Sequence, residues 1–218
     1  MSAMTAAELG FPDPPADQPQ WLALAQAVYN TQLPRFDNVC GGGLRWQAYQ
    51  SNGYNYKNSI ANGCFFNIAS RLAAYTGNAS YAANAESTWD WMRSVGFIDE
   101  NYYVYDGANT QTNCTPIVRQ QYSYNAGIFL LGAATMYKYV SSECFQLRVS
   151  VRSNGPQTNG SEIWKERVDG MLNATLSFFF PDGIAYEVSL ISILDCGCLY
   201  SSSGAWAPFQ EQTSTKGV

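Results

Sequence analysis

The sequence predicts an all-α domain arranged as a helical toroid. Apolar residues recur at helical spacing in five segments, and loops rich in glycine or aromatic residues separate these segments. The chain has 218 residues, of which 46% are hydrophobic and 13% charged, so it is long and apolar enough to bury a core. Helices joined by such loops favour a toroid over a four-helix bundle, although the periodicity alone fits both.

Three helices are predicted in the first half of the chain, over residues 21–34, 58–77 and 80–96. Residues 17–20, which precede the first helix, have the pattern of a capping box. Asn58 or Ser59 is expected to cap the second helix. Gly77 and Gly96 are expected to end the second and third, because glycine readily adopts the left-handed conformation that follows a helix.

Two more helices are predicted in the second half. Residues 97–107 alternate in polarity around a turn signal, which indicates a short hairpin or extended loop before them. Residues 121–139 are apolar nearly all round, as in a buried inner helix. A fifth helix is expected to begin near Ser161 and to end before Pro181.

One domain is expected over residues 1–187. Residues 142–158 lack a clear helical period and indicate an atypical insertion between the last two helices. Residues 188–218 pass from an apolar stretch into a sequence rich in serine, threonine and glycine, which predicts an atypical, disordered tail. Cys196 and Cys198 lack the second cysteine pair of a zinc site, so neither a metal nor a cofactor is predicted.

The charge of the chain excludes several classes of partner. Nucleic acids and anionic membranes need a basic surface, so a net charge of −5 predicts neither as a partner. The chain has no histidine, which leaves carboxylates, tyrosine, lysine or cysteine for acid–base chemistry. The longest apolar stretch, residues 126–134, is too short to span a membrane, so membrane contact is expected only through segments that this sequence lacks.

The composition is typical of a secreted glycoprotein. The chain has six cysteines, whose pairing the sequence leaves open. Four Asn-X-Ser/Thr sequons provide candidate glycosylation sites at Asn78, Asn113, Asn159 and Asn173. Residues 1–8 lack the charged start and apolar core of a signal peptide. We therefore expect a protein of the secretory pathway, of which this chain is an incomplete precursor.

Three loops combine tyrosine with asparagine, aspartate or glutamine, over residues 53–59, 102–107 and 121–125. Sugar rings present apolar C–H faces and many hydroxyls, so this mixture predicts a carbohydrate-binding cleft at one end of the helices. The candidate substrate-binding residues are Tyr56, Asn58, Asn62, Asp106, Gln121, Tyr124 and Asn125. The alternative is that these side chains only cap helices and satisfy loop backbones.

Asp106 is the best-placed acid in these loops, because it lies between Tyr105 and a glycine that permits a tight turn. Cleavage of a glycosidic bond requires two carboxyl groups. No second loop acid pairs with Asp106 convincingly, so the residues alone predict a sugar cleft without a catalytic pair of acids.

Several longer stretches match a known family. They are residues 11–28, 40–46, 53–66, 88–91, 104–108, 113–115 and 122–127, and they include Cys40-Gly-Gly-Gly-Leu-Arg-Trp46 and Tyr122-Ser-Tyr-Asn-Ala-Gly127. Through them the chain resembles glycoside hydrolase family 76, in the fungal endo-α-1,6-mannanase form involved in cell-wall biogenesis. Residues 159–187 resemble the next helix of that family. The segments that depart from its pattern are 116–120, 142–158 and 188–218.

This resemblance implies an (α/α)6 barrel and a cell-wall glycoprotein. It also implies a retaining, two-carboxylate enzyme that hydrolyses α-1,6-mannan or mannosylated anchors, or transglycosylates onto mannan. The catalytic groups of the family are an adjacent Asp–Asp pair, which the resemblance places upstream of Met1 together with the first helices of the barrel. We therefore expect an incomplete barrel with no catalytic residue and no activity of its own. The alternative is a non-catalytic protein that binds cell-wall polysaccharide.

Overall fold

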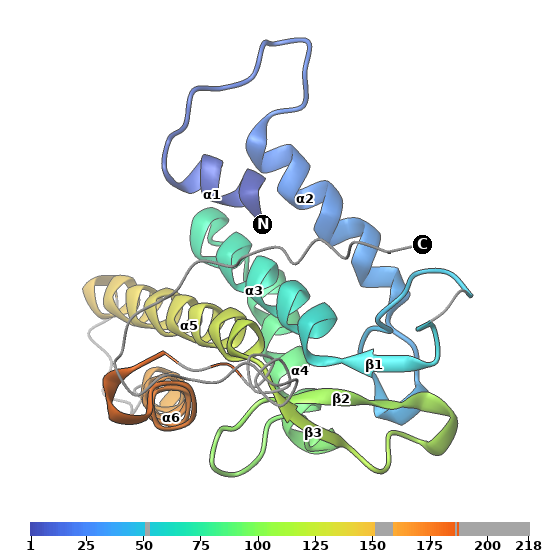
Figure 1. Ribbon diagram of the computed structural model, residues 1–218. Helices are drawn as coiled ribbons and strands as arrows, with labels where there is room; N and C mark the ends of the chain where they lie inside the picture. The colour runs from blue at the N-terminus through green and yellow to red at the C-terminus, as the bar shows by residue number, and fades with distance from the viewer. Residues whose placement is uncertain (51–52, 151–158, 186, 188–218) are drawn as a thin grey trace, which may run out of the picture.

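The computed structural model describes residues 1–50, 53–150, 159–185 and 187, and the side chains of all of these except 143–150 and 159. Figure 1 shows helices gathered around α3, with a small sheet at one end of that helix. The helices are α1 Ser2–Glu8, α2 Trp21–Gln32, α3 Ser59–Thr76, α4 Ala79–Val95, α5 Ser123–Ser150 and α6 Asn159–Phe179. The strands are β1 Tyr56–Asn58, β2 Tyr105–Asn109 and β3 Val118–Gln121. Short 3-10 helices cover Leu33–Arg35, Val39–Gly41, Thr110–Thr112 and Pro181–Gly183.

The core lies where α3 packs against α4 and α5, and α6 packs on α5. Phe66 of α3 is fully buried there and stacks on Phe129 at a centroid distance of 5.3 Å and on Trp164 at 5.9 Å. A Cβ on Gly132 would lie 2.4 Å from the Phe66 ring, so the two helices can approach this closely only with glycine at that position. Stacked rings and close helix contact thus hold the helical part together.

The sequence signals at the helix ends have mixed outcomes. Asn58 caps α3 as predicted, since its Oδ1 accepts a hydrogen bond from the Ala61 N–H. Gly77 and Gly96 adopt left-handed conformations directly after α3 and α4, which confirms both predicted ends. The predicted capping box before α2 is wrong, because the residue at the cap is Gln20 and its side chain does not cap the helix.

The prediction of an all-α fold is not exact, because β1, β2 and β3 form an antiparallel sheet in that order. Within it Lys57 pairs with Ala108, and Asn58 pairs with Gly107. A Cβ on Gly107 would lie 2.2 Å from the Lys57 carbonyl oxygen, so this close pairing depends on glycine. Strands of three to five residues are too short to show a period, which is why the pattern indicated only an extended segment over residues 97–107.

Two helices differ from the expectation. Helix α1 was not predicted; it docks through the fully buried Met4 and through Glu8, which forms an ion pair with Arg71 of α3. Helix α5 continues to Ser150, well past the predicted end at residue 139, so the first part of the 142–158 segment is helical. It is also not buried all round, because Leu131 is 49% exposed.

Some expectations fall outside the described residues. These are the remainder of the 142–158 segment and the predicted tail over 188–218 with its two cysteines. The domain end at residue 187 therefore stays a prediction. None of the helices in the described ranges is long and apolar enough to cross a membrane.

Candidate functional site

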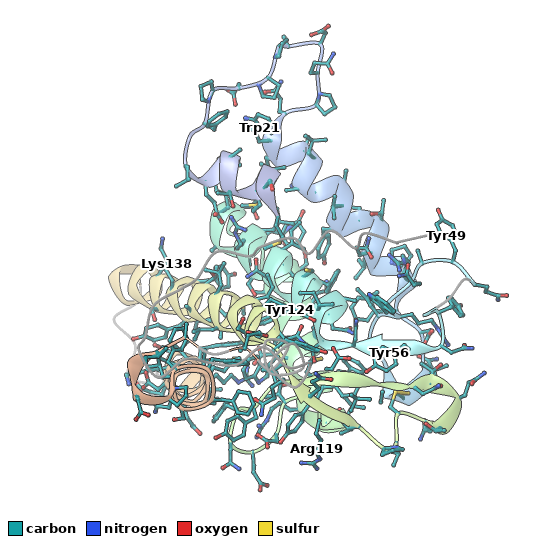
Figure 2. All side chains as sticks on the ribbon, viewed as in Figure 1. Trp21, Tyr49, Tyr56, Arg119, Tyr124 and Lys138 are labelled. Atoms are coloured by element: carbon teal, nitrogen blue, oxygen red, sulfur yellow. A yellow bond between two sulfur atoms is a disulfide. The ribbon has the colours of Figure 1, made fainter. Side chains whose placement is uncertain are left out.

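Four side chains meet where the sheet adjoins the start of α5, and we call Tyr56, Asp106, Tyr122 and Tyr124 the tyrosine–aspartate cluster. The pairing of β1 with β2 brings Tyr56 and Asp106 together, and the Tyr56 hydroxyl donates a 2.7 Å hydrogen bond to Asp106 Oδ2. The rings of Tyr122 and Tyr124 stack 5.2 Å apart at an interplanar angle of 15°. Figure 2 shows Tyr124 at the end of α5 that faces the strand carrying Tyr56.

The electrostatics of the cluster keep its phenols protonated. Burial raises the pKa of Tyr56, and the hydrogen bond and the charge of Asp106 raise it further. Burial is also the main cause of the raised pKa of Tyr122 and Tyr124, and the Asp106 carboxylate again adds to it. Tyr124 is 51% exposed, whereas Tyr56 and Asp106 are half-buried. The cluster thus offers hydroxyl donors, a carboxylate acceptor and an open aromatic face to one ligand.

Sequence reasoning missed two residues at this site. Tyr122 belongs to the predicted loop over residues 121–125, from which Gln121, Tyr124 and Asn125 were chosen but Tyr122 was not. Glu187 accepts hydrogen bonds of 2.9 and 3.2 Å from the backbone N–H of Ser123, and its charge helps to raise the pKa of Tyr122 after burial and Asp106. Glu187 therefore adds a second carboxylate beside the cluster. No local pattern could have indicated it, because it follows the last helix of the described chain.

The other predicted site residues lie at the same end of α3 and α5 but have different surroundings. Asn62 is fully buried; it accepts a hydrogen bond from the Leu44 N–H and donates to the carbonyls of Leu44 and Asn58. Gln121 is 9% exposed and lies opposite Tyr105 in the sheet. Asn125 is fully buried, and among the described residues neither atom of its amide has a hydrogen-bond partner. The helix cap thus uses Oδ1 of Asn58, and the loop contacts use both amide atoms of Asn62, without a ligand.

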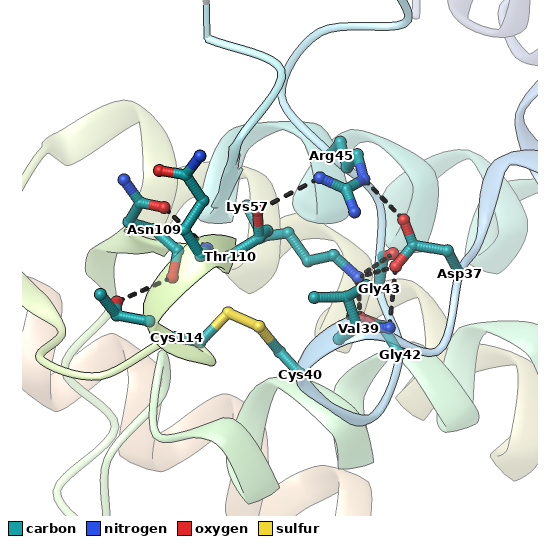
Figure 3. Close-up of a disulfide and its surroundings, with 12 residues drawn as sticks. Asp37, Val39, Cys40, Gly42, Gly43, Arg45, Lys57, Asn109, Thr110 and Cys114 are labelled. Atoms are coloured by element: carbon teal, nitrogen blue, oxygen red, sulfur yellow. Dashed lines mark hydrogen bonds and ion pairs between the residues drawn. A yellow bond between two sulfur atoms is a disulfide. The ribbon is translucent and has the colours of Figure 1, made fainter. Parts of the chain in front are cut away.

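A buried lysine in the strand that carries Tyr56 binds the loop that precedes this strand. Lys57, which follows Tyr56, is fully buried, and its ammonium donates to Asp37 Oδ1 at 2.7 Å and to backbone carbonyls in the loop before β1. These carbonyls belong to Val39, Gly42 and Gly43. Figure 3 shows this network beside a disulfide between Cys40 and Cys114, a pairing that the sequence had left open. The loop over residues 37–43 is thereby fixed to the sheet.

The network predicts a specific loss of stability in acid. Burial alone would raise the pKa of Asp37, but hydrogen bonds from Lys57 and Arg45 outweigh it and lower the pKa below its ordinary value. Such a carboxyl stabilises the fold above its unfolded-state pKa, and this contribution is lost as the pH falls through the lower folded-state pKa. We therefore expect Asp37→Asn to lower the melting temperature at neutral pH and to have less effect below about pH 4.

Melting curves of the wild type and the variant between neutral pH and about pH 2 test this expectation. Asp169→Asn is the control, because Asp169 is 54% exposed and pairs with Lys165 on the surface of α6. An Asp37→Asn variant whose deficit in melting temperature were the same at every pH would contradict the assignment.

No group of three or more His, Cys, Asp or Glu side chains in the described part of the chain is placed to hold a metal ion. The side chains of the cluster itself are three phenols and one carboxylate.

Comparisons with known proteins agree with one another. The model of glycosyl hydrolase family 76 matches residues 1–198. The mannan endo-1,6-alpha-mannosidase DCW1 of Saccharomyces cerevisiae is 44% identical over 87% of this chain and 38% of its own length. The corresponding DCW1 of Eremothecium gossypii is 50% identical over 68% of this chain and 34% of its own length.

Solved structures share the fold. The crystal structure of Dfg5 from Chaetomium thermophilum, in complex with glucosamine, is 49% identical with a TM-score of 0.76, and the match covers 87% of this chain and 42% of that one. The alpha-1,6-mannanase GH76A of Salegentibacter sp. HEL1_6 is 16% identical with a TM-score of 0.59, and the match covers 80% and 44% of the two chains. The chain thus spans about two fifths of the length of these relatives.

Proposed function

Because the chain belongs to glycosyl hydrolase family 76, we propose that it forms the sugar-binding part of an endo-acting enzyme of α-1,6-mannan. The structural neighbours of this family are helical toroids, and this chain matches part of such a toroid. The observation that carries the proposal is the Tyr56–Asp106 hydrogen bond beside the stacked, half-exposed Tyr124. Protonated phenols and a carboxylate bind sugar hydroxyls, and the open ring packs on the apolar face of the sugar.

Two ligands of related proteins support this substrate class. The Dfg5 structure from Chaetomium thermophilum contains glucosamine. An inactive variant of the Salegentibacter mannanase, in which two consecutive aspartates are replaced by asparagine, is described in complex with alpha-1,6-mannotriose. We propose a mannose polymer with the same linkage as the ligand of this chain.

The catalytic acids are proposed to lie outside these 218 residues. The sequence contains no two adjacent aspartates, whereas adjacent aspartates are the ones replaced in the inactive Salegentibacter variant. A retaining cleavage needs one carboxyl as nucleophile and a second as general acid. Asp106 then binds or orients the sugar, and the pair supplied elsewhere in the protein performs the cleavage, by hydrolysis or by transglycosylation.

The second candidate function is a non-catalytic protein that binds cell-wall polysaccharide. The same observation favours it, because a chain without the acid pair but with the cluster retains binding and loses chemistry. The two functions make the same prediction for binding and opposite predictions for cleavage by the longest form of the protein that the gene encodes.

Asp106→Ala in that longest form tests the binding role. We expect roughly tenfold weaker binding of α-1,6-mannotriose, because a charged acceptor of hydrogen bonds is removed from the site. Tyr56→Phe, which removes only the hydroxyl that donates to Asp106, is expected to act in the same direction with a smaller effect. Isothermal titration calorimetry with α-1,6-linked glucotriose as the control sugar measures both.

Asp169→Asn is the matched control for a lost surface carboxylate, and its affinity is expected to equal that of the wild type. Unchanged affinity and unchanged turnover in Asp106→Ala would assign Asp106 a purely structural role.

A secretory-pathway and cell-wall location is part of the same proposal. Three of the four sequon asparagines, Asn78, Asn113 and Asn173, are exposed in the structure, as a glycan requires. At Asn78 the cap of α4 uses Oδ1, which accepts from the Ser80 N–H and hydroxyl. A glycan would be attached through Nδ2, so it is compatible with this cap.

A further inference from the structure

A fourth aromatic residue, Trp46, lies next to the three tyrosines of the cluster and has no role in the site described so far. Trp46 follows the loop over residues 37–43 that Lys57 holds, and it is 50% exposed. Its ring lies 6.5 Å from that of Tyr56 at an angle of 76°, so the edge of one ring meets the face of the other. Because Tyr56 donates to Asp106, Trp46 lies one ring further from the carboxylate along a continuous line of polar and aromatic side chains.

The structure fixes the position of this indole although half of it faces solvent. The backbone N–H of Trp46 donates a 2.7 Å hydrogen bond to the Tyr56 carbonyl, which fixes the main chain that carries the indole. Gly53, with a φ of +92°, packs so closely that a Cβ there would lie 2.5 Å from the six-membered ring of Trp46. An indole that is held on one side and open on the other is pre-organised for a ligand, since little side-chain freedom remains to be lost on binding.

The neighbours of Trp46 are fixed as well. Arg45 binds Asp37 at 2.6 Å, donates to Thr110 Oγ1 and lies over the ring of Tyr54 at 4.5 Å. Lys57, next to Tyr56, is fully buried. The strand and the loop that carry Tyr56 and Trp46 therefore form one rigid unit with a constant spacing between the two rings.

We infer that Trp46 is a stacking platform for a second sugar of the same glycan, next to the sugar bound at the tyrosine–aspartate cluster. The open indole takes the apolar C–H face of a pyranose ring, and Asp106 with the phenols takes the hydroxyls of its neighbour. This inference rests on the proposed function and adds to it a selection for ligands of two or more linked sugars.

The test compares ligand lengths in the longest form of the protein that the gene encodes. For the wild type we expect α-1,6-mannotetraose to bind more tightly than methyl α-mannoside. Trp46→Ala is expected to bind the tetraose about tenfold more weakly, which is the typical effect of removing one aromatic anchor. Its affinity for the methyl mannoside is expected to stay almost unchanged. Trp46→Phe keeps a flat ring and is expected to retain part of the difference.

A second variant moves the indole without removing it. Gly53→Ala places a methyl group against the Trp46 ring and strains a left-handed residue, so it is expected to reduce tetraose affinity selectively. Trp21→Ala is the control, because Trp21 lies at the end of α2 far from the strand that carries Tyr56 (Figure 2). It is expected to leave the dependence on ligand length unchanged. Near-ultraviolet circular dichroism shows that each variant is folded.

The outcomes separate this inference from the proposed function. A wild type that binds neither ligand overturns both. A wild type that binds the tetraose, with Trp46→Ala retaining full affinity, overturns the platform and leaves the proposed function intact. Equal wild-type affinity for both ligands also overturns the platform and leaves the proposed function intact, because a second sugar would then make no contact.

Discussion

The 218-residue chain is expected to bind α-1,6-mannan without cleaving it. Under the proposed function, binding uses the cluster around Asp106, whereas cleavage uses an adjacent Asp–Asp pair, and no two aspartates are adjacent in this sequence. Loss of both the nucleophile and the general acid is expected to reduce turnover by at least roughly 10⁴-fold. Release of reducing ends from purified α-1,6-mannan measures the cleavage, and co-sedimentation with insoluble mannan measures the binding.

The DCW1 mannosidase of Saccharomyces cerevisiae serves as the full-length reference in the same assay. Cleavage by the 218-residue chain at a comparable rate would contradict the proposed location of the acids, and Asp106 with Glu187 would become the pair to examine. The charges of both carboxylates help to raise the pKa of Tyr122 after burial, so both lie near it and form an alternative pair within this chain.

Lys57→Met is expected to lower the free energy of unfolding by about 3 to 5 kcal/mol. The ammonium is fully buried and lies within hydrogen-bonding distance of Asp37 Oδ1 and of three carbonyl oxygens. Its removal takes a donor from all four acceptors, of which Asp37 still accepts from Arg45 and from the Val39 N–H. Methionine fills much of the same volume but donates nothing, so the loss isolates the polar network from the packing. Urea unfolding monitored by fluorescence gives the free energy.

Lys165→Met is the matched control, because Lys165 is 51% exposed and makes one ion pair with Asp169 within α6. It is expected to change the free energy of unfolding far less than Lys57→Met does, because a solvent-exposed ion pair contributes little. Equal effects of the two substitutions would show that the Lys57 network contributes no more than a surface pair. Since Lys57 lies beside Tyr56, its loss is also expected to weaken the binding of mannotriose.

Local signals predicted the helix ends better than any other feature. Asn58, Gly77 and Gly96 act through contacts within one turn of their own helix, so the residue type is sufficient to indicate the structure. The capping pattern over residues 17–20 failed because the Gln20 amide donates to backbone carbonyls of the preceding loop, beginning with Pro14. Competition of this kind between partners is not visible in a motif.

The sheet and the supporting network depend on contacts between distant segments. Strand β1 lies next to α3 in the sequence, but its partner β2 begins only at Tyr105, after two intervening helices. In the sequence Lys57 is one charged residue within a tyrosine-rich loop, and only the fold shows that it is buried. Neither the pairing nor the burial leaves a periodic trace.

The candidate site was predictable in composition but not in detail. Tyrosine and aspartate in loops indicated the chemistry, and the structure places Tyr56 and Asp106 in direct contact. Asn62 belonged to the same prediction, yet its amide bonds to the Leu44 backbone, and its role in sugar binding stays a prediction. A polar residue in the first turn of a helix has backbone partners within reach on both sides, and the sequence does not show which it uses.

The disulfide would set the order of two steps of biosynthesis if Asn113 is glycosylated. Cys114 is the middle residue of the sequon that begins at Asn113, and both residues adopt left-handed backbone conformations next to the bond with Cys40. Attachment of a glycan requires an accessible, extended Asn-X-Thr segment, whereas Cys114 is 2% exposed once the bond has formed. If Asn113 carries a glycan, that glycan must be attached before Cys114 finds Cys40. The speed of oxidation in the secretory pathway would then decide the glycoform of this protein.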